Sequence, residues 1–188
     1  MNTDTVRAKD NVVKSWVCSG SFDDAMLKGF LTFNEGLQKD GDTDAIIYID
    51  SPGGFVHSLN SILSVMENSS IRWHTCVIGE ASSAALILLA SGTYRYAGPK
   101  ARMMYHTLAF GTQGKVDSVQ EDADESKLLN LKVQEDFARK TKKSAAWWKA
   151  KTKTKESRDF WFYSESALEY GVIDKIGVPK ARVSVTIE

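Results

Sequence analysis

A serine on a glycine-containing turn is the first feature of this chain that could do chemistry. The turn, Gly79-Glu80-Ala81-Ser82-Ser83-Ala84, lies between an apolar strand-like run and an apolar helix-like run. At the start of a helix, backbone N–H groups and the positive end of the helix dipole converge, and they would stabilise negative charge on a bound carbonyl oxygen. The residues alone leave open whether Ser82 or Ser83 is the reactive one, and whether the serine merely caps the helix.

A second turn, Ser51-Pro52-Gly53-Gly54, also follows an apolar run and precedes a helical pattern. Two consecutive glycines let the backbone approach a ligand closely and direct its amides inward. Open parallel sheets bind ligands at the carboxyl ends of their strands, which is where both turns are expected to lie. An ordinary strand-to-helix connection would carry the same residues, so this turn alone does not establish a site.

A serine nucleophile needs a base, and the chain has three histidines. His57 falls in the first turn of a predicted helix and His74 inside a predicted strand, so both are expected to be structural. His106 directly follows the strand-like run 102–105 and precedes a glycine loop. Asp159 begins an aromatic run that would hold its carboxylate rigidly. It could orient the base, or it could serve as a cap or as an ion-pair partner of the preceding arginine.

Alternating strand and helix patterns that could position these residues fill the first half of the chain. Strands are predicted at 12–19, 45–49 and 71–78; helices are predicted from Ser21 to a break at Gly41, at about 55–68 and at 84–91. Ser21 is expected to cap the first helix with Asp24 as its reciprocal partner, and 79–83 is expected to be a tight turn. Strands that alternate with helices predict an α/β fold with a largely parallel sheet covered by helices.

The second half of the chain changes in character between residues 107 and 157. A glycine loop there leads into a long polar helix, whose sparse apolar positions are Leu128, Leu131 and Phe137. Such a helix either projects from the body or packs on another subunit. Short strands are predicted at 94–96, 102–105, 158–163 and 172–173. Ser164 is expected to cap a short helix that stops at Gly171.

Composition narrows the function classes. The chain has 188 residues and equal numbers of basic and acidic side chains, 24 of each, so we expect one domain over 1–188 and no general affinity for nucleic acid. Neither a secretory signal nor a membrane span is recognisable, which predicts a cytoplasmic protein.

Cys18 and Cys76 are expected to be buried thiols. No metal-binding or phosphate-loop motif is present, so neither metal nor cofactor is expected.

Five segments in order resemble ClpP, the proteolytic subunit of Clp proteases, over about residues 44–176. Residues 46–54 resemble its strand and oxyanion turn, and 79–83 match its G-x-A-x-S nucleophile turn. Residues 102–106 resemble the strand that carries its base, and 111–114 its glycine-rich loop. Its C-terminal pattern resembles Arg158-Asp159-Phe160 followed by Ser164, Ala167 and the run Glu169-Tyr170-Gly171-Val172-Ile173-Asp174.

The resemblance implies a ClpP/crotonase-like fold of repeated strand-strand-helix units with a projecting handle helix, in the region of about 107–157. It implies Ser83 as nucleophile, His106 as general base and Asp159 as the residue that orients it. The N–H groups of Gly54 and Ala84 would form the oxyanion hole. The family implies a homo-oligomer, a heptameric ring that can stack as a tetradecamer around a chamber, with polypeptide substrates delivered by an AAA+ Clp ATPase.

The sequence also departs from the family pattern. The family's H-Q-P is His106-Thr107-Leu108 here, and Ala84 replaces the methionine that follows the nucleophile. Residues 1–11 do not match the family's axial N-terminal segment, which argues against docking of an ATPase. These features predict a divergent member.

Two alternatives to a peptidase stay open. One is acyl-CoA chemistry on a crotonase fold, which needs no nucleophilic serine. The other is a catalytically inactive ring scaffold that binds a partner or nucleic acid through the basic segment 139–155, where eight bases accompany Trp147 and Trp148. For that segment we favour a solvated face near the acidic run 117–125 of a neighbouring subunit, so nucleic acid is not the expected partner.

Overall fold

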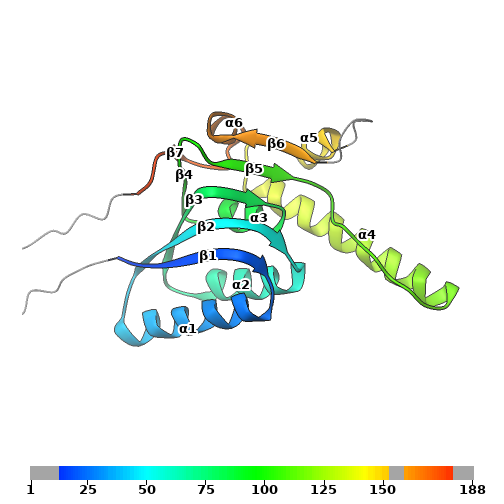
Figure 1. Cartoon of the computed structure of the whole chain (residues 1–188), viewed down its shortest axis with the longest axis horizontal. Helices are drawn as coiled ribbons and strands as arrows, with labels where there is room; N and C mark the ends of the chain where they lie inside the picture. Colours follow the sequence, from blue (N-terminus) through cyan, green and yellow to red (C-terminus); the bar gives the residue numbers. More distant parts are fainter. Residues whose placement is uncertain (1–12, 153–158, 180–188) are drawn as a thin grey trace, which may run out of the picture.

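A twisted, largely parallel sheet forms the centre of the molecule (Figure 1). The computed structural model describes residues 13–152 and 159–179. Its strands are β1 Lys14–Phe22, β2 Asp44–Gly54, β3 Arg72–Ser82, β4 Tyr94–Ala97, β5 Arg102–Tyr105, β6 Phe160–Tyr163 and β7 Lys175–Ile176. The main path runs β1-β2-β3-β4-β7, while β5 pairs with β3 and with β6. All described pairings are parallel except that of β5 with β6, so the predicted α/β architecture is confirmed.

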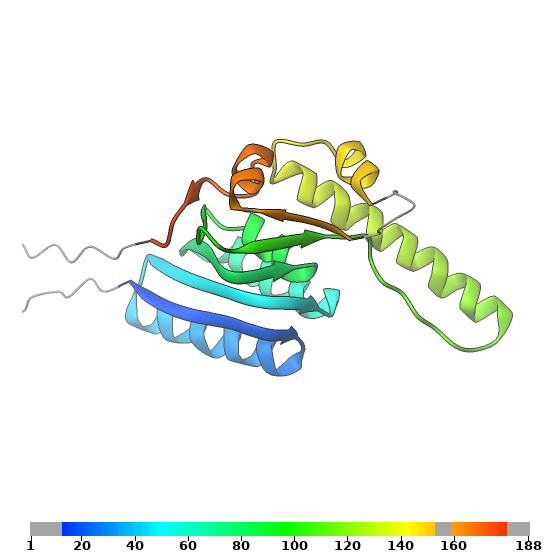
Figure 2. The ribbon, with the colours of Figure 1, turned by 45° about the horizontal axis from the view of Figure 1, so that its top comes forward.

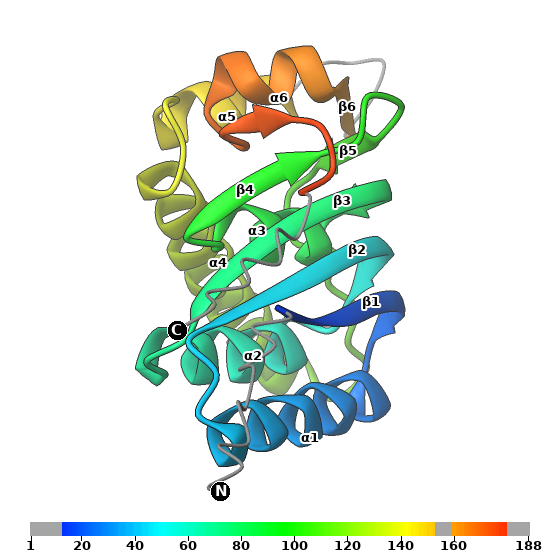
Figure 3. The ribbon, with the colours of Figure 1, turned by 90° about the vertical axis from the view of Figure 1, so that its left-hand side faces the viewer.

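The first three helices cover one face of this sheet (Figures 1 and 3). They are α1 Asp24–Asp40, α2 Val56–Asn68 and α3 Ala84–Ala90. Each connects two neighbouring parallel strands, and right-handed crossovers of this kind place successive helices on the same side. Alternate residues of β2, Ala45, Ile47 and Ile49, are fully buried beneath them. All seven residues of α3 are buried, which explains why this helix is apolar on every side.

The predicted starts of two helices were wrong, and their predicted stops were confirmed. Ser21 lies inside β1, and Asp23 caps α1 because its carboxylate accepts a hydrogen bond from Met26 N at 2.9 Å. Ser164 does not cap α6 Ser164–Tyr170 either, because its hydroxyl is buried and donates to Gly98 O at 2.8 Å. The stop at Gly41 holds: this residue takes the left-handed conformation that ends a helix (φ 72°). Gly171 ends α6 in the same conformation (φ 74°).

Two strand boundaries also differ from the prediction. Residues 79–82 are not a turn but the end of β3, and only Ser83 leaves the strand. Asp50 holds this extension in place, since its Oδ1 accepts from Glu80 N at 3.0 Å. Val172 and Ile173 do not form a strand. They fill the core after α6, at 0% and 2% exposure, and β7 begins at Lys175.

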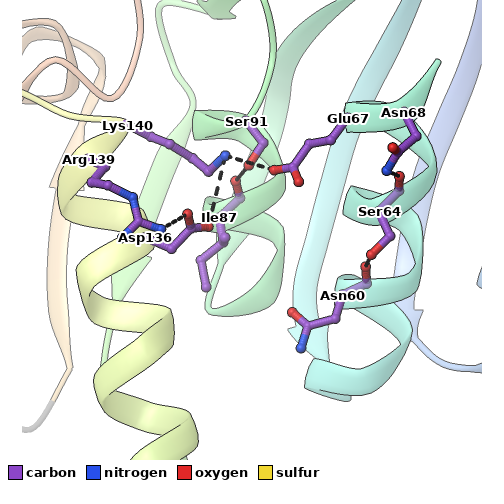
Figure 4. A network of polar contacts seen from close by, with 9 residues as sticks. All are labelled: Asn60, Ser64, Glu67, Asn68, Ile87, Ser91, Asp136, Arg139 and Lys140. Atoms are coloured by element: carbon purple, nitrogen blue, oxygen red, sulfur yellow. Dashed lines mark hydrogen bonds and ion pairs between the residues drawn. The ribbon is translucent and has the colours of Figure 1, made fainter.

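The long polar helix α4, Val116–Arg139, projects beyond the sheet (Figure 2), as the prediction of a projecting handle required. Only Gln134 and Phe137, near its C-terminal end, are buried. That end is attached to α2 through Lys140, whose ammonium lies 3.3 Å from Glu67 Oε1 (Figure 4). Leu128 and Leu131 remain exposed, at 46% and 47%. The helix therefore has an anchored end and a free end.

The basic segment that follows packs its two tryptophans against the body of the protein, while Arg139, Lys142 and Lys149 are exposed. The short helix α5, Ala145–Lys151, buries Trp148 completely, and its indole N–H donates to Thr141 Oγ1 at 3.0 Å. Trp147 packs partly buried against the same aromatic cluster. Trp148 is therefore not accessible for stacking on bases, and Trp147 is accessible only in part. Residues 153–155 of the segment, and Arg158, lie outside the described residues.

No helix in the described ranges is both long and apolar enough to cross a bilayer.

Candidate active site

Ser83 occupies a strained turn between β3 and α3. Its backbone has φ 56° and ψ −120°, and it is the one non-glycine among the described residues with positive φ. Its N–H donates to Met104 O at 2.9 Å, which ties the turn to the neighbouring strand β5. Strain of this kind, about 1–3 kcal/mol, is typical of functional positions. Ser83 precedes α3 directly, but its hydroxyl makes no capping bond to that helix, so capping is not its role.

The hydroxyl of Ser83 meets His106 instead. His106 Nε2 lies 2.7 Å from Ser83 Oγ, within hydrogen-bonding distance. Strand pairing explains this contact. Ser82 is in register with Met104 on the parallel strand β5, so β3 and β5 end at the same edge of the sheet. Ser82 directs its hydroxyl elsewhere, to Glu80 Oε1 at 2.7 Å. Of the two serines, only Ser83 has its hydroxyl within hydrogen-bonding distance of His106.

Asp159 approaches the other side of the imidazole. Its Oδ1 lies 3.9 Å from His106 Nδ1, an ion-pair distance rather than a hydrogen bond. Antiparallel pairing of β5 with β6 places Tyr105 opposite Phe160, so His106 and Asp159 are adjacent at the strand ends. The carboxylate is half-exposed, at 49%. The three predicted residues thus come together from three neighbouring strands, in the order serine, histidine, aspartate.

The glycine turn at the end of β2 packs directly against Ser83. Gly53 has φ 96°, and a Cβ built on it would lie 2.8 Å from Ser83 Cβ and 3.0 Å from Ala84 N. The turn is fixed from the other side by Ser51, whose hydroxyl donates to Gly20 O at 2.6 Å and accepts from Gly53 N at 3.1 Å. Gly54 also has positive φ, 154°. The space beside the serine and the first amide of α3 exists because residue 53 has no side chain.

An ion pair next to the serine was missed at the sequence level. Arg102 on β5 donates to Glu80 Oε2 on β3 at 2.9 and 2.6 Å, and its guanidinium lies 4.6 Å from the ring centre of Trp161 on β6. Burial would raise the pKa of Glu80, but hydrogen bonds from Ser82 and Arg102 outweigh it and lower that pKa. The pair therefore connects the strands that carry the three site residues. The sequence pattern gives no signal for this pair, because a turn at 79–83 would place Glu80 outside the strand.

A pocket opens beside Ser83 and His106, between α3 and α4. Its apolar walls are formed by Val56, Ile87, Leu108 and Val133. Asn130 of α4 fixes one edge, because its side-chain oxygen accepts from Leu108 N at 2.9 Å. A side chain could enter this pocket next to a carbonyl held at Ser83. The handle helix therefore contributes to the site as well as projecting from it.

A family model described as Clp protease matches residues 23–180. The matched range contains every residue of the site just described. The chain belongs to the Clp protease family.

Two curated relatives in this family show the degree of divergence. The chain is 39% identical over 145 residues to ATP-dependent Clp protease proteolytic subunit 2 of Corynebacterium jeikeium strain K411. It is 36% identical over 145 residues to ATP-dependent Clp protease proteolytic subunit 1 of Corynebacterium diphtheriae. Each alignment covers 76% of this chain and 66% of the relative, so the chain spans just under two thirds of their length.

The remaining histidines of this family member lie in the first turn of α2 and in β3, and its cysteines lie in β1 and β3. His57 stacks on Phe55 with ring centres 5.2 Å apart, and His74 Nε2 lies 3.1 Å from Asp44 Oδ1 at the opposite end of the sheet. Both thiols are buried, and burial raises the pKa of Cys18 to about 12 and that of Cys76 to about 11. Burial and a raised pKa are typical of structural cysteines. Within the described residues, no cluster of three or more metal-ligating side chains occurs.

Proposed function

We propose that this protein is a serine peptidase that cleaves polypeptides through Ser83, His106 and Asp159. The observation that carries the proposal is the 2.7 Å contact between His106 Nε2 and Ser83 Oγ on a strained turn before α3. The proposal is supported by family membership and by the names of the relatives, which describe proteolytic subunits of ATP-dependent Clp proteases. Acyl-CoA chemistry would give this hydroxyl no function.

In the proposed reaction, Ser83 Oγ attacks the scissile carbonyl carbon while His106 Nε2 takes the hydroxyl proton. His106 then returns that proton to the leaving amine, which leaves an acyl ester on Ser83. A water molecule, deprotonated by the same nitrogen, hydrolyses the ester and releases the new carboxyl terminus. Asp159 keeps the imidazole oriented and stabilises its protonated form through Nδ1. The 3.9 Å separation leaves room for this contact to shorten when substrate binds.

The negative oxygen of the tetrahedral intermediate needs donors, and we assign them to the N–H groups of Gly54 and Ala84. Three features support this assignment. Ala84 N is the first amide of α3. Phe22 is in register with Gly54, and its carbonyl oxygen accepts from Phe55 N at 2.8 Å. Because neighbouring amides along a strand point to opposite sides, the Gly54 amide lies on the side of β2 away from β1. A Cβ at Gly53 would lie 3.0 Å from Ala84 N, so only a glycine leaves room for an oxygen there.

Assembly belongs to the same proposal. We propose that copies of this chain form heptameric rings, that two rings stack through α4, and that polypeptides are cleaved inside the chamber. The polar, projecting α4 with exposed Leu128 and Leu131 supports a contact between copies. The relatives' names suggest a separate ATPase as the partner that delivers substrate.

The test is cleavage of a fluorogenic peptide by the wild type and by two serine variants. Ser83→Ala removes the nucleophile and is expected to lower kcat by at least about 10³-fold. Ser82→Ala is the matched control, since it removes a neighbouring hydroxyl that faces Glu80, and it is expected to retain kcat within about tenfold. Comparable kcat values for Ser83→Ala and wild type would refute the proposal.

A further inference from the structure

Two buried polar atoms at the pocket beside Ser83 are unexplained by the mechanism above. Tyr105 and Gln134 both line the pocket, and each is only 4% exposed. Among the described residues, neither Tyr105 OH nor Gln134 Nε2 has a hydrogen-bond partner. Buried polar groups in native proteins nearly always have one, because an unpaired donor loses its hydration without compensation. Two such atoms at one pocket point to a ligand group that completes them.

Packing fixes the ring of Tyr105, and Gln134 lies on the anchored part of its helix. The ring of Tyr105 stacks on Phe137, with centres 5.3 Å apart, and packs on Trp148 at 5.0 Å. Burial raises the pKa of Tyr105 to about 12, so its hydroxyl keeps its proton and can donate at neutral pH. Gln134 is fixed on the buried, anchored end of α4. Gln134 Nε2 can only donate, whereas Tyr105 OH can donate or accept, so a single acceptor group would satisfy both atoms.

We propose that this pocket binds the substrate side chain just before the scissile bond, and that it selects a straight side chain with an uncharged acceptor at its end. Glutamine fits this description best. Its methylene groups would lie along Val56, Ile87 and Val133, and its amide oxygen would accept from Tyr105 OH and Gln134 Nε2. This inference rests on the proposed function, because it places the substrate relative to Ser83.

A charged or wholly apolar side chain fits less well. A carboxylate would be buried between neutral donors without a cation to balance it. Norleucine or leucine would fill the apolar part but leave both donors unpaired after displacing any water there. A site built to hydrogen-bond its substrate rejects an analogue that lacks the acceptor, and one lost hydrogen bond corresponds to about tenfold in kcat/KM.

The experiment compares two peptides that differ only in the residue before the scissile bond, glutamine or norleucine. The quantity measured is the ratio of their kcat/KM values. Tyr105→Phe removes one donor and keeps the stacked ring, and Gln134→Met removes the other and keeps the length of the side chain. Each variant is expected to lower the glutamine-to-norleucine ratio by about tenfold. Tyr94→Phe is the matched control, since it removes a half-exposed hydroxyl outside the pocket and is expected to leave the ratio unchanged.

A ratio that stays within twofold of wild type in both pocket variants would overturn the inference. It would mean that Tyr105 and Gln134 are structural, or that a permanently bound water satisfies them. Binding of the same two peptides to Ser83→Ala protein can be measured by fluorescence anisotropy. This gives a ratio of Kd values that does not depend on cleavage. If the wild type cleaves nothing, the proposed peptidase fails, yet a ratio of Kd values that responds to Tyr105→Phe still supports the pocket. Equal Kd values in every variant would contradict it.

Discussion

Ser83 and Gly53 depend on each other at the residue scale. The serine takes a conformation that costs a non-glycine residue energy, and the glycine lets β2 approach closely enough to leave space beside it. A hydroxyl in this position is presented to His106 rather than used to cap α3. The proposed reactive geometry therefore depends on close contact between the β2 turn and the backbone at Ser83.

Gly53→Ala is expected to disable the site. Its new Cβ would lie 2.7 Å from Ser82 O and 2.8 Å from Ser83 Cβ, and its φ of 96° disfavours any side chain. We expect kcat to fall at least about 100-fold and the free energy of unfolding to fall by about 1–3 kcal/mol. Peptide kinetics and urea denaturation measure the two effects. Gly36→Ala is the matched control: it lies within α1 with nothing within 4 Å of the new methyl, so it should stabilise the fold by about 0.5–1 kcal/mol. Full activity of Gly53→Ala would show that the turn tolerates a side chain.

At the scale of elements, the parallel pairing of β3 with β5 and the antiparallel pairing of β5 with β6 bring the three site residues together. Strand and helix positions in the first half were predictable from the spacing of apolar residues. The end of β3 was not, because Gly79 and Glu80 have low strand propensity and are held by Asp50 on the adjacent strand. Likewise, Val172 and Ile173 have strand-forming side chains, but the chain uses them to fill the core. The spacing and propensity of neighbouring residues do not indicate such long-range contacts.

The site could be predicted only in part for the same reason. Residue types suggested a serine, a histidine and an aspartate, but only the family resemblance selected Ser83 over Ser82. The structure gives the physical reason, because alternation along β3 directs Ser82 toward Glu80 while the positive φ of Ser83 directs it toward His106. The unpaired donors on Tyr105 and Gln134 have no signature in the sequence at all, since burial and pairing appear only after folding.

Asp44 gives a prediction of how stability depends on pH. Arg72, on the neighbouring strand, donates to both carboxylate oxygens, and His74 and Thr43 add further bonds, which hold the pKa of Asp44 well below its usual 3.8. A carboxyl group whose pKa is lower in the folded state stabilises the fold above the unfolded pKa and loses this effect as pH falls through the folded value. We therefore expect Asp44→Asn to lower the free energy of unfolding at pH 7, and the difference from wild type to shrink below about pH 4.

Urea denaturation of wild type and Asp44→Asn between pH 7 and pH 2 measures that difference. Arg72→Ala is the control background, because removing the main partner should reduce the pH dependence of the Asp44→Asn effect. A difference that stays constant over the whole pH range would contradict the assigned role of the ion pair.

At the scale of the whole molecule, α4 both lines the pocket and projects away from the body. One helix could thus connect assembly to catalysis. A polar helix in which even Leu128 and Leu131 are exposed has too little apolar surface to fold back on its own subunit. In the proposed assembly, the partner of α4 is a second copy of the chain.

The double substitution Leu128→Glu and Leu131→Glu is expected to separate stacked rings. It places buried charge into the proposed contact between α4 helices, so the assembly mass measured by sedimentation velocity should fall by about half. Leu31→Glu on α1, which alters a leucine of similar exposure (41%), is expected to leave the mass unchanged. An unchanged mass in the double variant would exclude α4 as the stacking surface.

The most direct test of the central claim is covalent labelling with a fluorophosphonate, followed by mass spectrometry of the peptide that contains Ser82 and Ser83. The account predicts one adduct per subunit on Ser83, none on Ser82, and labelling at least about 100-fold slower in His106→Ala, because the imidazole removes the hydroxyl proton. Assembled wild-type protein whose Ser83 stays unmodified, or is modified equally fast without His106, would contradict it.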